Sequence, residues 1–199
     1  MRNRIHLMLA LVAAVALVAA PAFAAGTVGE KAPAFSLSDL DGNTHSLADY
    51  EGKVVVLEWI NPNCPFSDRH AKEETMAGLA DKHGEVVWLA INSTAPEHKD
   101  FLQKSEHAEW AAERAVDYAI LYDESGDVGH AYDAKTTPHM YVIDEAGNIA
   151  YNGAIDDDQA GRKEQAERDN YVDGALVAHT AGSSIDPAST RPYGCSVKY

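Results

Sequence analysis

The chain has 199 residues, of which 31 are acidic and 16 are Lys or Arg, so its formal net charge is −15. A surface this acidic repels nucleic acid and anionic lipid, which argues against partners of either kind. The length is enough for one domain with a sizeable core.

Residues 1–24 have the pattern of a secretory signal peptide. Arg2 and Arg4 give a positive start, an apolar run follows, and small residues precede an expected cleavage after Ala24. The apolar run is shorter than the about 20 residues that a membrane-spanning helix needs. Cleavage leaves 14 basic and 31 acidic residues, a formal charge of −17. We therefore expect a soluble periplasmic or secreted protein with no membrane partner once the signal is removed.

Strands and helices are expected to alternate after this segment. Val-rich apolar runs predict buried strands, and Asp-Gly or Ala-Gly-Asn steps between short runs predict hairpins. In chain order the expected elements are a hairpin at 33–50, a strand at 53–60, a helix from Cys64 to about Gly84, a strand at 85–93, a helix from Pro96 to about Val116, a strand at 119–124, a short helix at 126–134, a hairpin at 138–153 and a helix at 172–179. This order indicates an α/β fold with a mixed sheet. Residues 182–199, rich in Ser, Pro and Gly, are expected to be a flexible surface tail.

Cys64 and Cys195 are the two cysteines of the chain. In an oxidising compartment, two cysteines most simply form a structural disulfide. Cys64, however, follows a buried strand and precedes Pro65, a residue that suits the first position of a helix. Helix N-terminal N–H groups favour the thiolate, so Cys64 is expected to be accessible, largely ionised and nucleophilic. Ser67 lies one turn on, within reach of the sulfur; a plain capping and packing role for this segment stays open.

Two further features stand out in the predicted strands. Glu58 interrupts an apolar strand, and burial would raise its pKa towards neutrality, as suits a proton shuttle for a nearby thiol. A strand-end glutamate that reaches solvent is the alternative. Thr137-Pro138 opens a late strand, where a sheet protein can hold a cis peptide bond, although a trans proline is more frequent in general.

The combination of a strand, Cys-x-x-Ser at a helix start, a βαβ crossover and Thr-Pro before a hairpin resembles the thioredoxin superfamily. More closely, the chain resembles peroxiredoxin-like redoxins related to alkyl hydroperoxide reductase and thiol-specific antioxidant proteins, in an exported subfamily. The segments that carry this resemblance are 32–59, 61–66, 86–93, 122–144 and 191–199. The resemblance implies a thioredoxin-like domain over 25–181, with a central mixed β-sheet flanked by helices and an N-terminal β-hairpin extension, and a tail over 182–199 that carries Cys195. It also implies that Thr137 and Pro138 lie beside Cys64 and contact the substrate, and that Glu58 is the buried acid.

Two departures from the family patterns limit the expected chemistry. Thioredoxins carry Cys-x-x-Cys, but Ser67 holds the second position here and cannot form a disulfide. Peroxiredoxins carry Pro-x-x-x-Thr-x-x-Cys, and those two positions hold Leu57 and Asn61, although the Asn61 amide could still donate a hydrogen bond. We therefore expect a thiol oxidoreductase, acting as an antioxidant or in thiol-disulfide exchange, in which Cys64 reacts with peroxide or a protein disulfide and Cys195 resolves the product within or between subunits. A thiol reductant is an expected partner and a homodimer is possible; no cofactor or metal is expected.

Other classes remain open. A copper-binding module would use Cys64 with histidines such as His70, His130 and His139, and a redox-inactive thioredoxin-fold module would keep a structural Cys64–Cys195 disulfide. A calcium loop that starts at Asp39 is weaker, because Thr44 and Tyr50 stand where Gly and Glu are required. The acidic run 156–158 is expected to be a solvated turn.

Overall fold

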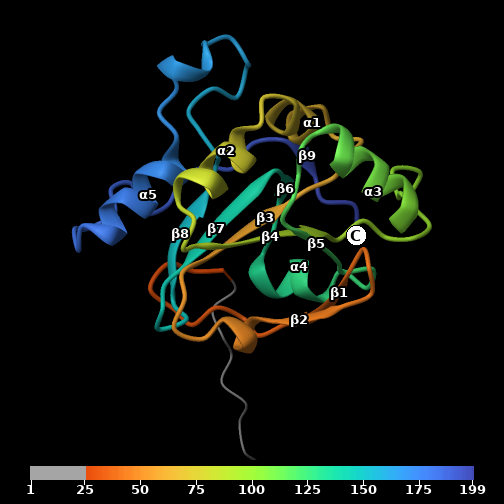
Figure 1. Ribbon diagram of the computed structural model, residues 1–199, viewed down its shortest axis with the longest axis horizontal. Helices are drawn as coiled ribbons and strands as arrows, with labels where there is room; N and C mark the ends of the chain where they lie inside the picture. Colours follow the sequence, from red (N-terminus) through yellow and green to blue (C-terminus); the bar gives the residue numbers. More distant parts are fainter. Residues whose placement is uncertain (1–25) are drawn as a thin grey trace, which may run out of the picture.

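The computed structural model describes residues 26–199 (Figure 1). The predicted signal peptide, residues 1–24, lies outside the described residues, so that expectation stays a prediction. Within residues 26–199, none of the helices combines the length and the apolar character that crossing a membrane requires.

A seven-stranded mixed sheet forms the centre of the fold, in the order β2-β1-β5-β4-β3-β7-β8. Its strands are β1 (Ser36–Asp39), β2 (Thr44–Ser46), β3 (Val55–Trp59), β4 (Val87–Asn92), β5 (Ala119–Tyr122), β7 (His139–Ile143) and β8 (Ile149–Gly153). Strands β3, β4 and β5 run parallel, whereas β7 is antiparallel to β3 and to β8. The β1–β2 hairpin extends the sheet because β1 pairs antiparallel with β5. The predicted mixed sheet and N-terminal hairpin are therefore confirmed.

The helical elements are η1 (Leu47–Tyr50), α1 (Pro65–Lys72), α2 (Thr75–Lys82), α3 (Lys104–Glu113), α4 (Asp127–Tyr132), η2 (Gln165–Glu167) and α5 (Tyr171–Thr180). Two predicted helices differ from this. The helix after Cys64 is broken in two, because Glu74 adopts a left-handed conformation with φ of 51°. The helix expected from Pro96 begins only at Lys104, where Gln103 and Glu106 form a capping box, and residues 95–101 are held in successive turns.

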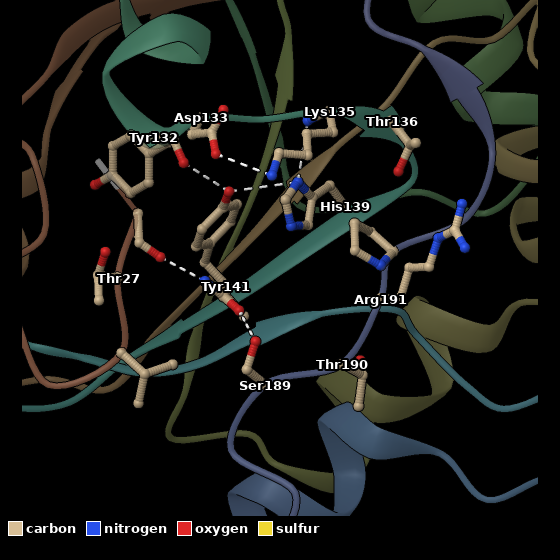
Figure 2. Close-up of a pocket in the computed structure, with 14 residues that line it drawn as sticks. Thr27, Tyr132, Asp133, Lys135, Thr136, His139, Tyr141, Ser189, Thr190 and Arg191 are labelled. Atoms are coloured by element: carbon tan, nitrogen blue, oxygen red, sulfur yellow. Dashed lines mark hydrogen bonds and ion pairs between the residues drawn. The ribbon is translucent and has the colours of Figure 1, made fainter. Parts of the chain in front are cut away.

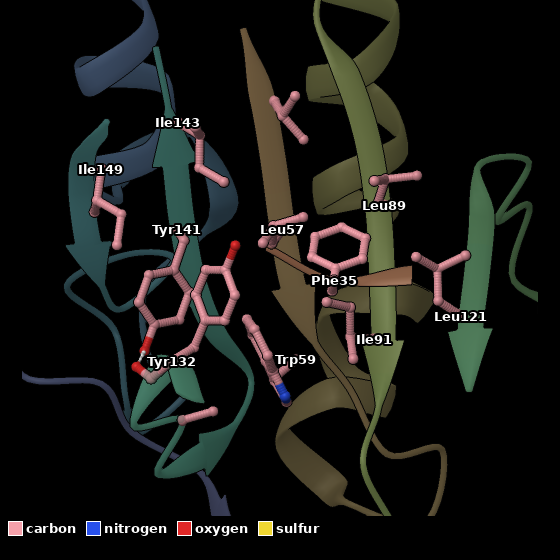
Figure 3. Packing of buried hydrophobic residues seen from close by; sticks show 12 residues of the cluster. Phe35, Leu57, Trp59, Leu89, Ile91, Leu121, Tyr132, Tyr141, Ile143 and Ile149 are labelled. Carbon is pink, nitrogen blue, oxygen red and sulfur yellow. Dashed lines mark hydrogen bonds between the residues drawn. The ribbon is translucent and has the colours of Figure 1, made fainter. Parts of the chain in front are cut away.

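The core has two sides because the side chains of each strand alternate across the sheet. On β3, Leu57 and Trp59 point to the side that carries Phe35 and Tyr132 of α4, as Figure 3 shows. Val56 points to the opposite side, which α2 and α5 cover. Helices on both faces explain why β3 and β4 read as almost uninterrupted apolar runs. Glu58 is the exception, and its place in β3 puts it on the side of Val56.

The C-terminal tail is docked rather than loose. The two-residue strands β6 (Thr136–Thr137) and β9 (Cys195–Ser196) pair antiparallel, with Thr137 opposite Cys195. On one side of β9, Tyr193 is buried at 7% exposure. On the other side, the Tyr199 ring stacks on His130 with centroids 3.9 Å apart, and its hydroxyl donates to the Ala134 carbonyl at 2.8 Å. The expectation of a flexible surface tail is therefore wrong for residues 193–199.

Candidate active site

The loop after β3 brings Cys64 to the N-terminus of α1. Cys64 is the N-cap residue, Pro65 follows at the first helical position, and the Asp68 N–H donates to the Cys64 carbonyl at 2.9 Å. Proline is tolerated there because its missing N–H is one that the helix leaves unpaired. The sulfur therefore lies at the helix end that carries free N–H groups, as the sequence predicts, and the Ser67 backbone interacts with it.

Three segments meet at the Cys64 sulfur. The Thr137-Pro138 peptide bond is cis, and the Thr137 carbonyl oxygen lies 2.8 Å from Cys64 Sγ as a hydrogen-bond acceptor. Cys195 reaches the same place because β9 pairs with β6, and both cysteines are free thiols. The structure thus places Thr137, Pro138 and Cys195 where the sequence expects them, beside Cys64.

The two thiols differ in acidity. Burial acts to raise the pKa of Cys64. Hydrogen bonds with the Thr137 side chain, with the Ser67 backbone and with both the side chain and the backbone of Cys195 outweigh burial, so the pKa of Cys64 is lowered. The pKa of Cys195 is raised to about 11, first by burial and then by the hydrogen bond to Cys64 and the charge of that residue. Cys64 is therefore the more acidic thiol of the pair, and Cys195 the less acidic one.

The Cys64 sulfur is not open to solvent. The residue is only 2% exposed, whereas Cys195 is partly exposed. The expectation of an accessible sulfur is wrong for this conformation, because strands β6 and β9 lie against it. The second cysteine of the chain thus forms part of the cover over the first.

Glu58 is buried in β3, the strand that leads to this site. Its side chain lies on the same side of the sheet as Val56 at 5% exposure, and its Oε2 accepts a hydrogen bond from the Tyr118 hydroxyl at 2.9 Å. Burial raises the pKa of Glu58 from 4.5 to about 7, against the opposing effect of the Tyr118 hydrogen bond. A small cavity is lined by Glu58, Ser67 and His70 together, and the Ser67 hydroxyl has no partner within the described chain. A solvent-exposed glutamate is excluded, and a buried proton acceptor near α1 is what the geometry provides.

Asn61 stabilises the conformation of the loop between β3 and α1. Its amide nitrogen donates to the Thr94 hydroxyl at 2.8 Å, and its Oδ1 accepts from the Asn63 N–H at 2.7 Å. The Cys64 N–H in turn donates to the Asn61 carbonyl at 2.9 Å. These hydrogen bonds fix the segment that leads to Cys64. A direct contact between Asn61 and peroxide stays a prediction.

A buried polar cluster near the site is absent from the sequence predictions. Asp156 is 2% exposed and Asp158 is 4% exposed, so the expected solvated turn is wrong. The Tyr193 hydroxyl donates to Asp156 and lies 2.9 Å from His70 Nε2. Arg69 also donates to this hydroxyl, at 3.2 Å. The cluster ties helix α1 to the tail two residues before Cys195, and only the acidic run itself hinted at it in the sequence.

The residues considered for metals have other contacts. His70 belongs to the Tyr193 cluster, His130 stacks on Tyr199, and His139 Nδ1 accepts from the Lys135 N–H at 3.2 Å. Asp39 caps the first hairpin by accepting from the N–H groups of Asp41 and Asn43. Among residues 26–199, His, Cys, Asp and Glu form no group of three that could hold a metal ion.

A cysteine at a helix N-terminus facing a cis-proline loop, on a mixed sheet with helices on both faces, defines a thioredoxin-like redoxin. Residues 28–152 match the profile of the AhpC/TSA family, and the chain belongs to that family.

Curated relatives with redox names are similar to part of the chain. It is 31% identical over 123 residues to the thiol-disulfide oxidoreductase ResA of Geobacillus thermodenitrificans, a match that covers 61% of this chain and 66% of ResA, about two thirds of that relative. It is 34% identical over 127 residues to the thioredoxin-like protein YneN of Bacillus subtilis, covering 61% of this chain and 68% of YneN.

A solved structure is similar over more of the chain. An uncharacterised conserved protein from Geobacillus kaustophilus superposes with a TM-score of 0.78 at 29% identity, and the match covers 89% of this chain and 94% of that protein. The similarity thus extends past the family match at residues 28–152.

Proposed function

We propose that this protein is a two-cysteine thiol oxidoreductase in which Cys64 attacks the substrate and Cys195 resolves the product. The observation that carries the proposal is the pairing of two free thiols with opposite pKa shifts, lowered at Cys64 and raised to about 11 at Cys195. Membership of the AhpC/TSA family and the similarity to ResA support the same chemistry.

The main proposed reaction is thiol-disulfide exchange. The Cys64 thiolate attacks one sulfur of a substrate disulfide, forms a mixed disulfide and releases the other substrate sulfur as a thiolate. Cys195 loses its proton and attacks the Cys64 sulfur, which forms the Cys64–Cys195 disulfide and expels the second substrate sulfur. The substrate gains two electrons and the protein loses two. A dithiol reductant returns the protein to the free-thiol state shown here.

A hydroperoxide is the second candidate oxidant, and the burial of Cys64 favours it because a small molecule passes a cover that excludes a protein. The Cys64 thiolate would take the terminal peroxide oxygen to become a sulfenic acid, and the remaining alkoxide or hydroxide would leave with a proton. Cys195 would then form the same disulfide with loss of water. The substitution of Leu57 and Asn61 at the two peroxiredoxin positions argues for a slow reaction of this kind.

Glu58 is the proposed proton acceptor of the resolving step. A carboxyl group with a pKa of about 7 is partly ionised at neutral pH, so it can both take up and release a proton. Ser67, whose unpartnered hydroxyl lines the same small cavity, extends this polar route toward the start of α1. The proposed setting is the periplasm or the outside of the cell, which rests on the predicted signal peptide.

Peptide mapping without reductant tests the proposal directly. The protein is treated with a slight excess of hydrogen peroxide or of a small disulfide, then digested with and without a mild thiol reductant. A Cys64–Cys195 peptide that forms with either oxidant and disappears with the reductant supports the cycle. A link already present before oxidation and resistant to mild reductant would identify a structural disulfide instead.

Variants separate the roles of the two thiols. In Cys195→Ser, Cys64 should accumulate as a mixed disulfide or sulfenic acid, whereas Cys64→Ser should leave Cys195 unmodified at neutral pH. Equal modification of the remaining thiol in the two variants contradicts the assignment. Copper titration of Cys64→Ser against the unaltered protein tests the copper-binding alternative, which requires the affinity to fall with loss of the sulfur.

A further inference from the structure

A pocket of about 680 Å³ opens next to the redox site but contains neither sulfur. Figure 2 shows its walls, which come from the end of α4, the start of β7, residues 26–28 and the tail at 189–192. Thr136, which precedes the cis-proline pair, also lines it. The pocket therefore lies between the cis-proline loop and the segment that leads to Cys195.

His139 presents an unused donor to this pocket. The residue lines the pocket and is buried, with 4% of its surface exposed. The fixed Lys135 N–H donates to His139 Nδ1, so the neutral imidazole carries its proton on Nε2. Burial lowers the pKa of His139 to about 4, which keeps the ring neutral at physiological pH. Nε2–H makes no hydrogen bond within residues 26–199, and it is free to donate to a ligand.

The charged residues of the pocket leave one positive charge unbalanced. Lys135 Nζ pairs with Asp133 at 3.1 Å, so these two charges offset each other. Arg191 lines the pocket and has neither an ion pair nor a hydrogen bond to any of the described side chains or carbonyls. Arg191 and His139 therefore bring one unpaired positive charge and one unused N–H donor to the lining of the same pocket.

We propose that this pocket binds a small organic monocarboxylate. The planar guanidinium fork of Arg191 matches the two oxygens of a carboxylate, and the His139 Nε2–H supplies a second, directional donor. The single unbalanced positive charge matches a monoanion better than a phosphate dianion. Val28 and Pro192, which also line the pocket and are partly exposed, provide apolar contact for the organic part of the ligand. The ligand would bridge β7 to the tail without touching Cys64 or Cys195.

Titration followed by ¹H–¹⁵N NMR tests the proposal, with phenylacetate as the probe. Phenylacetate should saturate and shift the ring signals of His139 and the side-chain signal of Arg191. The neutral analogue phenylacetamide should bind at least about tenfold more weakly, because it lacks the charge that Arg191 recognises. The dianion phenylphosphonate should show no gain over phenylacetate. A Cys64→Ser/Cys195→Ser double variant should bind phenylacetate as the unaltered protein does, so the result is independent of the proposed redox function.

Arg191→Gln is the decisive variant, since Arg191 is exposed and its loss leaves the core intact. We expect it to weaken phenylacetate binding about tenfold or more, whereas Arg162→Gln, an exposed arginine outside the pocket lining, should not. Equal binding of acid and amide, tighter binding of the phosphonate, unchanged affinity in Arg191→Gln, or shifts confined to other parts of the chain would each overturn the proposal.

Discussion

Replacing Glu58 by Gln should make the protein more stable at alkaline pH and little changed at acid pH. The carboxyl group is buried at 5% exposure, and its pKa is raised from 4.5 to about 7 because ionisation inside the core loses hydration. The native state therefore holds this proton more tightly than the unfolded chain does. Stability contributed by the protonated form is fully present below pH 4.5 and is lost as pH rises through about 7.

The size of the effect follows from that pKa difference. One pKa unit corresponds to about 1.4 kcal/mol, so the full loss is about 3 kcal/mol, of which about 2 to 3 kcal/mol falls between pH 5 and pH 8. The glutamine side chain of the variant carries no charge at any pH, so the variant lacks this loss. The free energy of unfolding of Glu58→Gln relative to the unaltered protein should therefore rise by that amount over the interval.

Urea unfolding of both proteins, under reducing conditions at several pH values, measures this difference and cancels the titration of every other group. Tyr118→Phe is the matched variant, because it removes the one hydrogen bond that lowers the pKa of Glu58. Its loss of stability should continue to higher pH than in the unaltered protein, because the native-state pKa of Glu58 is then higher. A difference between Glu58→Gln and the unaltered protein that is constant from about pH 5 to pH 8 would refute the assignment of a raised pKa to this residue.

Three further predictions concern the tail and its contacts. Cys195→Ala should raise the pKa of Cys64, because hydrogen bonds from Cys195 lower that pKa in the unaltered protein. The pH dependence of Cys64 alkylation by iodoacetamide measures the shift, and an unchanged midpoint would contradict the prediction. Gly194→Ala places a Cβ 2.1 Å from the Thr137 carbonyl oxygen and should slow Cys64–Cys195 disulfide formation by about tenfold to a hundredfold, whereas Gly182→Ala, with open space around its Cβ, should not. Tyr193→Phe removes the hydroxyl that Asp156 and His70 share, and it should lower the free energy of unfolding in urea by about 1–3 kcal/mol. Tyr199→Phe should lower it less, because the Tyr199 hydroxyl donates to one backbone carbonyl only. Equal losses in the two variants would show that the buried cluster does not add to stability.

The elements that were predicted correctly carry their signal locally. Strand β3 is an apolar run because both of its faces are buried, and the two hairpins have turn residues between short strands. The position of Cys64 is equally local, since Pro65 follows it at the start of α1. Periodicity and turn chemistry act over a few residues, so one sequence is enough to read them.

The features that were missed depend on contacts between distant segments. Strands β6 and β9 have two residues each, too few to show a period, and they meet across almost 60 residues of chain. Asp156 is buried because Tyr193 and Arg168 reach it from later parts of the chain. A short acidic run with no visible partner is ordinarily a solvated one, so the sequence alone favoured the wrong interpretation.

The pairing of the two cysteines also sets the order of the proposed steps. While Cys64 is ionised, its charge and its hydrogen bond to Cys195 help to raise the pKa of Cys195 to about 11, so the second thiol stays protonated. Oxidation of Cys64 removes that charge and that acceptor, which leaves burial as the main cause that raises the pKa of Cys195. The pKa of Cys195 must then fall, which eases transfer of its proton to the acceptor proposed above, Glu58, whose pKa is about 7. The resolving thiol is thus held protonated until its target sulfur has been oxidised, which favours the sequence attack, resolution and reduction.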